Sequence, residues 1–226
     1  MSRKVVVLRP EPGLSETLSA ARTAGLEAIG SPLFEIEPVA WDLPDPAEFD
    51  ALLVGSANVF RHGGQGLEQL RALPVHAVGK RTAQAAHDAG FEVSSVGSGG
   101  LQQVLDGLSA PLRLLRLAGA ERVTLTPPAG ITTSEKVVYR AAPLPLEDNA
   151  VEILSSGDAV ALLHSGAAAR RLAAECERVG LARGSIALAA LAPRIAECAG
   201  EGWKSVQVAP QTDDAALLAM LADICH

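Results

Sequence analysis

The sequence predicts an α/β fold built from two doubly wound units with parallel sheets. Three observations predict it: short apolar runs alternate with segments of helical periodicity, this pattern recurs about 110 residues further along the chain, and the apolar residues are mostly aliphatic. Hydrophobic residues make up 48% of the 226, yet aromatic residues make up only 3%. A chain of this length and composition can bury the cores of two small domains and is too apolar to be disordered.

Each element follows from the local pattern. Val5–Leu8 is a buried strand that ends at Arg9, and apolar residues at helical spacing then lead to Gly25, where a helix is expected to end. Further elements are expected as follows: extended segments at 27–29 and 31–38, strands at 50–56, 74–79, 92–96 and 112–117, and helices at 82–89 and 99–108. Strands and helices that alternate at these lengths favour parallel sheets.

The second half of the chain repeats the first. Five segments have counterparts later in the sequence, in the same order: 5–9 with 113–117, 35–38 with 139–143, 50–58 with 158–166, 76–83 with 189–196, and 90–105 with 202–220. One such match could arise by chance, whereas five in order predict two copies of one α/β unit. Two such domains are expected to leave a cleft, with ligands beyond the carboxyl ends of the strands.

The charge balance excludes large polyanions as partners. The 19 Lys and Arg are outnumbered by 26 Asp and Glu, which gives a formal net charge of −7. Nonspecific affinity for nucleic acids comes from phosphate neutralisation by Lys and Arg, so no nucleic acid is expected as a partner, and no anionic membrane either. The scarcity of aromatic residues also removes the platforms on which single strands stack.

No leader or membrane span is expected from the sequence. The apolar run after Lys4 is too short for a signal sequence, and no later run reaches the ~18 apolar residues that cross a bilayer. Cys176, Cys198 and Cys225 are odd in number and widely spaced, which fits neither a disulfide framework nor a CxxC motif. We therefore expect a cytoplasmic protein, and we expect a monomer.

Familiar cofactor motifs do not occur. Gly79–Thr82 lacks the spacing of a P-loop, and Gly97–Gly100 lacks the third glycine of a dinucleotide fingerprint. Neither Ser56 nor Ser165 lies in a GxSxG motif, and no two histidines have HxxxH spacing. No metal, nucleotide or other cofactor is expected.

Small polar and basic residues remain where the predicted strands end. A strand-to-helix turn leaves backbone N–H groups that can hold a carboxylate, and hydroxyl or amide side chains there can assist. The polar residues are equally suited to be helix caps, and a solvated position is the alternative for the basic ones, so both interpretations stay open. The polar set is Ser56, Asn58, Thr82 and Ser165, and the basic set is Arg9, Lys80, Arg81, Arg116 and Arg194.

Tyr139 is the sole tyrosine and follows the start of the second extended connector. One interpretation is a half-buried strand residue whose hydroxyl lies at the rim. The other is a catalytic acid, because a phenol can donate a proton to a leaving group.

The chain resembles the uroporphyrinogen-III synthase family over nearly its whole length. The resemblance is carried by the order of six segments: Val5–Pro10, 31–38, Ser56–Asn58, 77–83, Val138–Arg140 and Ser165–Gly166. No one of these segments is specific, because each is a short α/β turn. Their order, the repeat and the chain length together support the resemblance.

The resemblance implies two flavodoxin-like domains joined by a two-stranded connector that the chain crosses twice. The first domain would combine 1–36 with 146–226, the second would hold 39–138, and the connectors would be 36–39 and 138–146. The repeat alone would divide the chain near residue 110.

The resemblance also implies a reaction without a cofactor. The family closes the linear tetrapyrrole hydroxymethylbilane into uroporphyrinogen III, with loss of water and inversion of ring D. A general acid helps the hydroxyl leave, and the substituted carbon of the terminal ring attacks. Unassisted closure gives the uninverted isomer, so the protein must chiefly control the substrate's conformation.

Carried over to this sequence, the resemblance gives Tyr139 the role of the acid. Ser56, Asn58, Thr82 and Ser165 would bind the acetate and propionate groups, with Arg9 and Lys80 at the rim. The departures lie mostly in the second half. Ala192 and Ile195 stand where the family has Gly and Thr, and Pro127–Pro128 interrupt a segment where a helix is expected, which predicts that this helix is shortened or lost.

Two alternatives to the enzyme are a noncatalytic two-domain module that binds or senses a small molecule, and a pseudo-enzyme of the same fold. The net charge of −7 also demands explanation, since the substrate carries eight carboxylates. Helix N-termini and a few Arg and Lys would have to create a positive potential locally.

Overall fold

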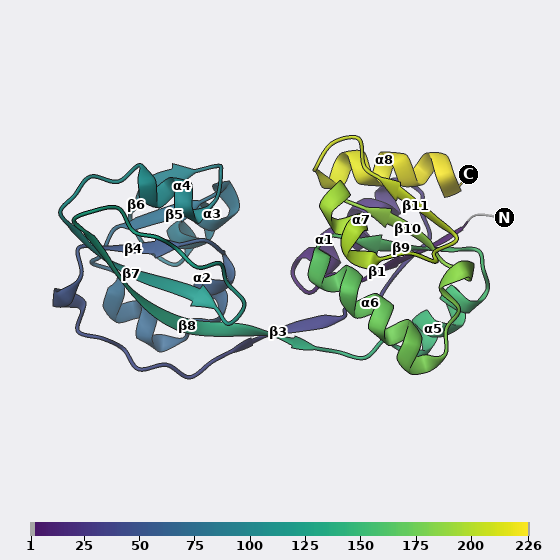
Figure 1. Cartoon of the computed structure of the whole chain (residues 1–226), viewed down its shortest axis with the longest axis horizontal. Coiled ribbons are helices and arrows are strands. Elements are labelled where there is room, and N and C mark those ends of the chain that lie inside the picture. The colour runs from purple at the N-terminus through teal and green to yellow at the C-terminus, as the bar shows by residue number, and fades with distance from the viewer. Residues whose placement is uncertain (1–2, 226) are drawn as a thin grey trace. The chain divides into compact units, whose positions relative to one another are not determined.

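The computed structural model describes residues 3–225 and divides into two compact units (Figure 1). Unit 1 consists of 1–35 and 142–226, and unit 2 consists of 36–141. Among the residues described, no helix combines the length and the apolar character needed to cross a membrane.

Unit 1 has a five-stranded parallel sheet in the order β2-β1-β9-β10-β11. This is the flavodoxin order, in which the chain switches direction across the sheet between β1 and β9. The strands are β1 (Lys4–Val7), β2 (Ala28–Gly30), β9 (Ala159–Leu163), β10 (Ala187–Ala190) and β11 (Ser205–Val208). The helices are α1 (Gly13–Thr23), α5 (Asp148–Ser155), α6 (Gly166–Val179), α7 (Pro193–Ala199) and α8 (Asp214–Cys225), and a 3-10 turn spans Arg183–Ser185.

Helices cover both faces of this sheet. Val5 and Val7 point to the face under α1 and α8, whereas Val6 points to the face under α5, α6 and α7. Because strand side chains alternate between faces and both faces are covered, β1 and β9 consist of fully apolar residues apart from Lys4. The expected helix up to Gly25 is α1, and Gly25 has a positive φ of 74° just beyond its end.

Unit 2 has a parallel sheet in the order β8-β7-β4-β5-β6, with β3 added beside β8. Its strands are β3 (Phe34–Pro38), β4 (Ala51–Val54), β5 (Val75–Val78), β6 (Val93–Gly97), β7 (Leu112–Gly119) and β8 (Ile131–Pro143). Its helices are α2 (Asn58–His62), α3 (Lys80–Asp88) and α4 (Leu101–Asp106), with 3-10 turns at Pro46–Glu48 and Gln65–Leu70. The order is the flavodoxin order started at β7, as expected if the chain enters this unit part-way through the pattern.

The internal repeat holds in space. The strand orders of the two sheets correspond: β8-β7-β4-β5-β6 in unit 2 matches β2-β1-β9-β10-β11 in unit 1. Strand β7 therefore takes the place of β1, and β4 takes the place of β9. The sheet faces match as well: Arg116 and Leu53 lie on the face under α4, and Val7 and Leu162 lie on the corresponding face under α8. The predicted fold class is therefore confirmed. The residues at which each domain begins and ends stay a prediction.

One helix of the pattern is replaced by a loop. In unit 1, α1 connects β1 to β2, but the corresponding segment 120–130 of unit 2 contains no helix, although all its residues are described. Pro127 and Pro128 lie in this loop, and proline removes a backbone donor and clashes with the preceding turn. The predicted loss of the helix is confirmed, and it leaves α4 as the helix on this face of the sheet.

The two connecting strands run side by side. The Val39 amide donates to the carbonyl of Val138, and the Leu144 amide donates to that of Leu33, so β3 and the second part of β8 are antiparallel. The first part of β8 pairs in parallel with β7.

Candidate active site

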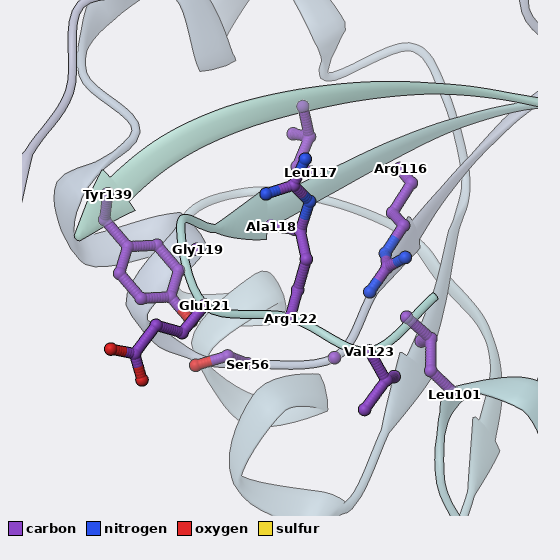
Figure 2. Close-up of a pocket in the computed structure, with 11 residues that line it drawn as sticks. Ser56, Leu101, Arg116, Leu117, Ala118, Gly119, Glu121, Arg122, Val123 and Tyr139 are labelled. Atoms are coloured by element: carbon purple, nitrogen blue, oxygen red, sulfur yellow. The ribbon is translucent and has the colours of Figure 1, made fainter. Parts of the chain in front are cut away.

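A pocket lies beyond the carboxyl ends of β4 and β7 in unit 2 (Figure 2). Its volume is about 180 Å³, smaller than the ~300–1,000 Å³ typical of sites for whole drug-sized ligands. The strands that flank it are the two between which the chain order reverses, which is where open parallel sheets bind ligands. The lining residues are Gly55, Ser56, Leu101, Arg116, Leu117, Ala118, Gly119, Glu121, Arg122, Val123 and Tyr139.

Tyr139 is placed in this pocket by strand register. It pairs with Gly119 across β8 and β7, just after a register shift in the ladder. A Cβ on Gly119 would lie 2.7 Å from the Tyr139 ring and 2.9 Å from its hydroxyl oxygen, so the absence of a side chain there lets the ring lie over the β7 backbone. Figure 2 shows the ring reaching from β8 toward Ser56 and Glu121.

Ser56 lines the same pocket, and its Oγ accepts a hydrogen bond from the Asn58 amide at 3.2 Å. Asn58 begins α2, and its side-chain oxygen accepts from Arg61 at 3.4 Å. Ser56 therefore organises the strand-to-helix turn while remaining at the pocket wall. The two interpretations of Ser56, as a turn residue and as a ligand contact, are compatible.

Two arginines and a glutamate form a cluster on the side of the pocket away from Tyr139. Arg116 Nη1 lies 2.7 Å from Glu135 Oε2, and Arg122 Nε bonds to Glu135 Oε1. A second hollow beside the first is lined by all three residues. Burial lowers the pKa of Arg116, and the Glu135 carboxylate opposes that shift.

The solvated position considered for Arg116 is wrong, because only 4% of this residue is exposed. Sequence reasoning placed it at a turn, whereas it lies inside β7. Arg122 and Glu135 were not singled out at all. The signal in the sequence was the pair Pro127 and Pro128. These prolines remove the helix expected after β7, and without that helix the loop residue Arg122 lies over β7.

Thr82 and Lys80 lie at the end of β5. Thr82 is 4% exposed in the first turns of α3, and Lys80 lies at the start of that helix. Neither lines the pocket that holds Tyr139. Their assignment as substrate contacts stays a prediction.

In unit 1, the corresponding edge holds Arg9 and Ser165. Arg9 follows β1, and its Nη1 lies 3.0 Å from Asp214 Oδ2 and 3.2 Å from Thr17 Oγ1. Ser165 is the N-cap of α6, and its Oγ accepts from the Ala168 amide at 3.1 Å. The cap interpretation of Ser165 is confirmed, and the roles of both residues toward a ligand stay predictions.

His164 directly precedes Ser165 in the chain and was not singled out from the sequence. Its side chain is 6% exposed, and its Nε2 lies 3.3 Å from Asp214 Oδ1. Burial, reinforced by the positive charge of Arg9, lowers the pKa of His164 from 6.5 to about 4, against the opposing effect of Asp214. The neutral His164 therefore lies beside the carboxylate that binds Arg9, and neither ring nitrogen has a hydrogen-bond partner among the described residues.

The stability of unit 1 is expected to fall when the pH drops from about 6.5 to about 4. In this window the unfolded chain binds a proton at His164 and the folded chain does not, so the free energy of unfolding decreases by up to about 3 kcal/mol. His164→Asn should flatten this part of the curve, as measured by urea unfolding at several pH values. Parallel curves for the variant and the wild type would contradict the burial argument.

The turn after β10 contains no side chain with a hydroxyl group. Ala192 is the N-cap of α7, Pro193 follows, and Ile195 packs into the core of unit 1. A hydroxyl contact from this turn is therefore excluded, in keeping with the departure seen in the sequence. Within residues 3–225, no group of three or more His, Cys, Asp or Glu is arranged to hold a metal ion.

The fold and the pocket define a two-domain, flavodoxin-like α/β protein with a site at the switch point of its second sheet. A crystal structure of uroporphyrinogen-III synthetase from Helicobacter pylori is similar, with a TM-score of 0.68 and 17% identity over 98% of this chain and 99% of that one. A mutant uroporphyrinogen III synthase from the extremely thermophilic bacterium Thermus thermophilus has a TM-score of 0.52 and 16% identity, over 97% of each chain. A comparison with curated proteins gave no match.

The model of the family described as uroporphyrinogen-III synthase HemD matches residues 15–219. The chain belongs to this family. Its activity is accordingly that of a cyclizing hydro-lyase of tetrapyrrole biosynthesis, and the noncatalytic alternative is not favoured.

Proposed function

We propose that Tyr139 is the general acid in the cyclisation of hydroxymethylbilane to uroporphyrinogen III by this chain. The observation that carries the proposal is the position of the Tyr139 ring in the switch-point pocket, over the side-chain-free backbone of Gly119. A phenol at this place can reach a ligand from the pocket wall, and no bulkier residue at position 119 would allow the same ring position.

In the first step, the C–O bond of the substrate's hydroxymethyl group breaks. The Tyr139 hydroxyl gives its proton to the departing oxygen, so that water leaves and an azafulvene cation remains. The substituted carbon of the terminal ring attacks this cation, and the bond to the neighbouring ring breaks and re-forms. The final aromatisation releases one proton from a ring carbon, which can return to the phenolate and restore Tyr139.

Orientation is the second contribution of the protein. The unassisted reaction closes without inversion, so the bound substrate must present the substituted carbon to the cation. We propose that Ser56 and Asn58 in unit 2 and Ser165 and Arg9 in unit 1 bind acetate and propionate groups for this purpose. Thr82 and Lys80 are proposed as further contacts, with Lys80 the more accessible of the two.

The proposed function also includes the setting in which the chain works. We propose a monomeric, cytoplasmic enzyme whose partner is hydroxymethylbilane. The free thiols of Cys176 and Cys198 support a reducing compartment, where disulfides are rare.

The direct test of the proposed activity generates the substrate hydroxymethylbilane within the assay. A hydroxymethylbilane-producing enzyme is coupled to this protein, and the oxidised porphyrins are separated by isomer. The expected result is mostly the inverted isomer III, in an amount that rises with protein concentration. Formation of isomer I alone would refute the proposal and would favour a pseudo-enzyme of the same fold.

A further inference from the structure

Arg116 occupies a position that the fold reserves for an apolar side chain. It pairs with Leu53 on the sheet face that corresponds to the face of Val5 and Val7 in unit 1, and both valines are fully buried there under α1 and α8. Its neighbours on the same sheet face, Leu114 and Leu53, are also fully buried. A guanidinium at this interior position has lost its hydration, and an apolar residue would fill the site at lower cost in free energy.

The bonding of Arg116 is incomplete. Its Nη1 is paired with Glu135, whereas its Nε is buried and has no hydrogen-bond partner among residues 3–225. Folding alone does not account for such a group, because a buried donor without an acceptor lowers stability. The side chain nevertheless lines the pocket, so a ligand entering there meets a poorly compensated positive charge.

Arg122 and Glu135 complete the arrangement. Glu135 has one oxygen on Arg116 and the other on Arg122, and the Arg122 Nη1 donates to the Ala120 carbonyl at 2.9 Å. The Glu135 carboxylate thus fixes both guanidiniums while neutralising only one of their two charges. Figure 2 shows Arg122 between Tyr139 and Arg116, with Glu121 on the side of Tyr139.

We propose that Arg116 and Arg122, held by Glu135, bind one acetate or propionate carboxylate of the tetrapyrrole. The identity of the ligand rests on the proposed function, but the chemistry of the cluster independently points to a carboxylate. A guanidinium presents a planar fork of N–H donors that matches this group. Leu101 and Val123 line the same pocket, and Val123 is 66% exposed, so an apolar edge is available for the attached pyrrole ring.

The experiment measures the binding of uroporphyrin III, the oxidised octacarboxylate, by fluorescence titration without turnover. Arg122→Gln should weaken binding about tenfold, which is the loss expected for one charge-assisted hydrogen bond. Arg116→Met should weaken binding at least as much, yet its melting temperature should equal or exceed that of the wild type, because Glu135 keeps Arg122 as its partner and a buried donor without an acceptor is removed. In the coupled assay, both variants should raise KM with little change in kcat, because the carboxylate is bound equally before and during the reaction.

Arg113→Gln is the matched control. Arg113 lies on the same strand, is exposed, and is ion-paired with Asp50 at 2.7 Å at the opposite end of β7. Its substitution removes the same charge and one ion pair but does not touch the pocket, so binding of uroporphyrin III should stay within about twofold of the wild type.

The outcomes separate this inference from the proposed function. Binding by Arg116→Met and Arg122→Gln that equals the Arg113→Gln control overturns the carboxylate site, as does a wild type that binds no uroporphyrin III. A lower melting temperature with unchanged binding would show that Arg116 only supports the fold. If the wild type makes only isomer I while the two variants lose uroporphyrin binding, the proposed function fails and the carboxylate site stands.

Discussion

Tyr139→Phe is expected to lower kcat of the cyclisation about 100-fold, the lower end of what a positioned general acid contributes. The phenylalanine ring keeps the contacts of the tyrosine ring with the core of unit 2 and removes only the proton that the departing hydroxyl needs. KM should therefore change by no more than about twofold, because the lost interaction forms in the transition state. Steady-state kinetics with hydroxymethylbilane produced in place measures both parameters.

A second variant tests the position of the ring rather than its hydroxyl. Gly119→Ala would place a methyl group within 2.7 Å of the Tyr139 ring, so the ring must move away from β7. This variant should also lower kcat, although its hydroxyl is intact. Ser56→Ala is the contrasting control, for which a rise in KM without a fall in kcat is expected. Unchanged kcat in Tyr139→Phe would remove Tyr139 from the catalytic role.

Local patterns in the sequence predicted the strands and helices up to residue 117 apart from α2 and the 3-10 turns, and several site positions. The strand that ends at Ser165 and the helix that follows predict a cap there, and the structure has that cap. Tyr139 could be singled out because it is the sole tyrosine and lies in a connector. These inferences needed only neighbours in the chain or the repeat.

The features that the sequence did not predict depend on contacts between distant parts of the chain. Arg9 and Asp214 are 205 positions apart, and His164 joins them only once β1, β9 and α8 are packed. No local pattern distinguishes Arg116, which is buried, from Arg113, which lies on the same strand and is exposed. Its burial depends on the loop 120–130 and on β8, whose register with β7 no local pattern specifies.

The net charge of −7 does not describe the candidate site. Pocket residues Arg116 and Arg122 carry two positive charges beside the single carboxylate of Glu135, and Glu121 is the acidic residue at the exposed side. The acidic excess of the chain therefore lies largely elsewhere. The two arginines and the two glutamates balance, so the pocket is locally neutral within an acidic protein, which lowers the repulsion that a polycarboxylate meets there, since screening limits the effect of distant surface charges.

The connector that returns to unit 1 is anchored by a buried ion cluster on α6. Glu175 is 1% exposed, accepts a hydrogen bond from the Leu146 amide at 2.8 Å, and pairs with Arg171 and Arg178 at 3.0 and 2.7 Å. Arg171 also donates two hydrogen bonds to the Leu144 carbonyl. The hydrogen bonds from Arg178 hold the pKa of Glu175 below its ordinary value against the effect of burial, so the carboxylate is charged at neutral pH.

Glu175→Gln is expected to destabilise unit 1 by about 2 kcal/mol, because the buried carboxylate is the charged acceptor for the Leu146 amide and for Arg171 and Arg178, and a neutral amide weakens these hydrogen bonds. Trp203 packs against the core of unit 1 and Trp41 against that of unit 2, so urea unfolding in a Trp41→Phe background reports on unit 1 alone. The matched control is Glu177→Gln on the same helix, where an exposed carboxylate pairs with Arg183 and a change within about 1 kcal/mol is expected. Equal midpoints for the two variants would show that the cluster does not hold the connector. A large loss for Glu175→Gln would instead show that the folding of unit 1 depends on residues 144–146, through which the chain re-enters it.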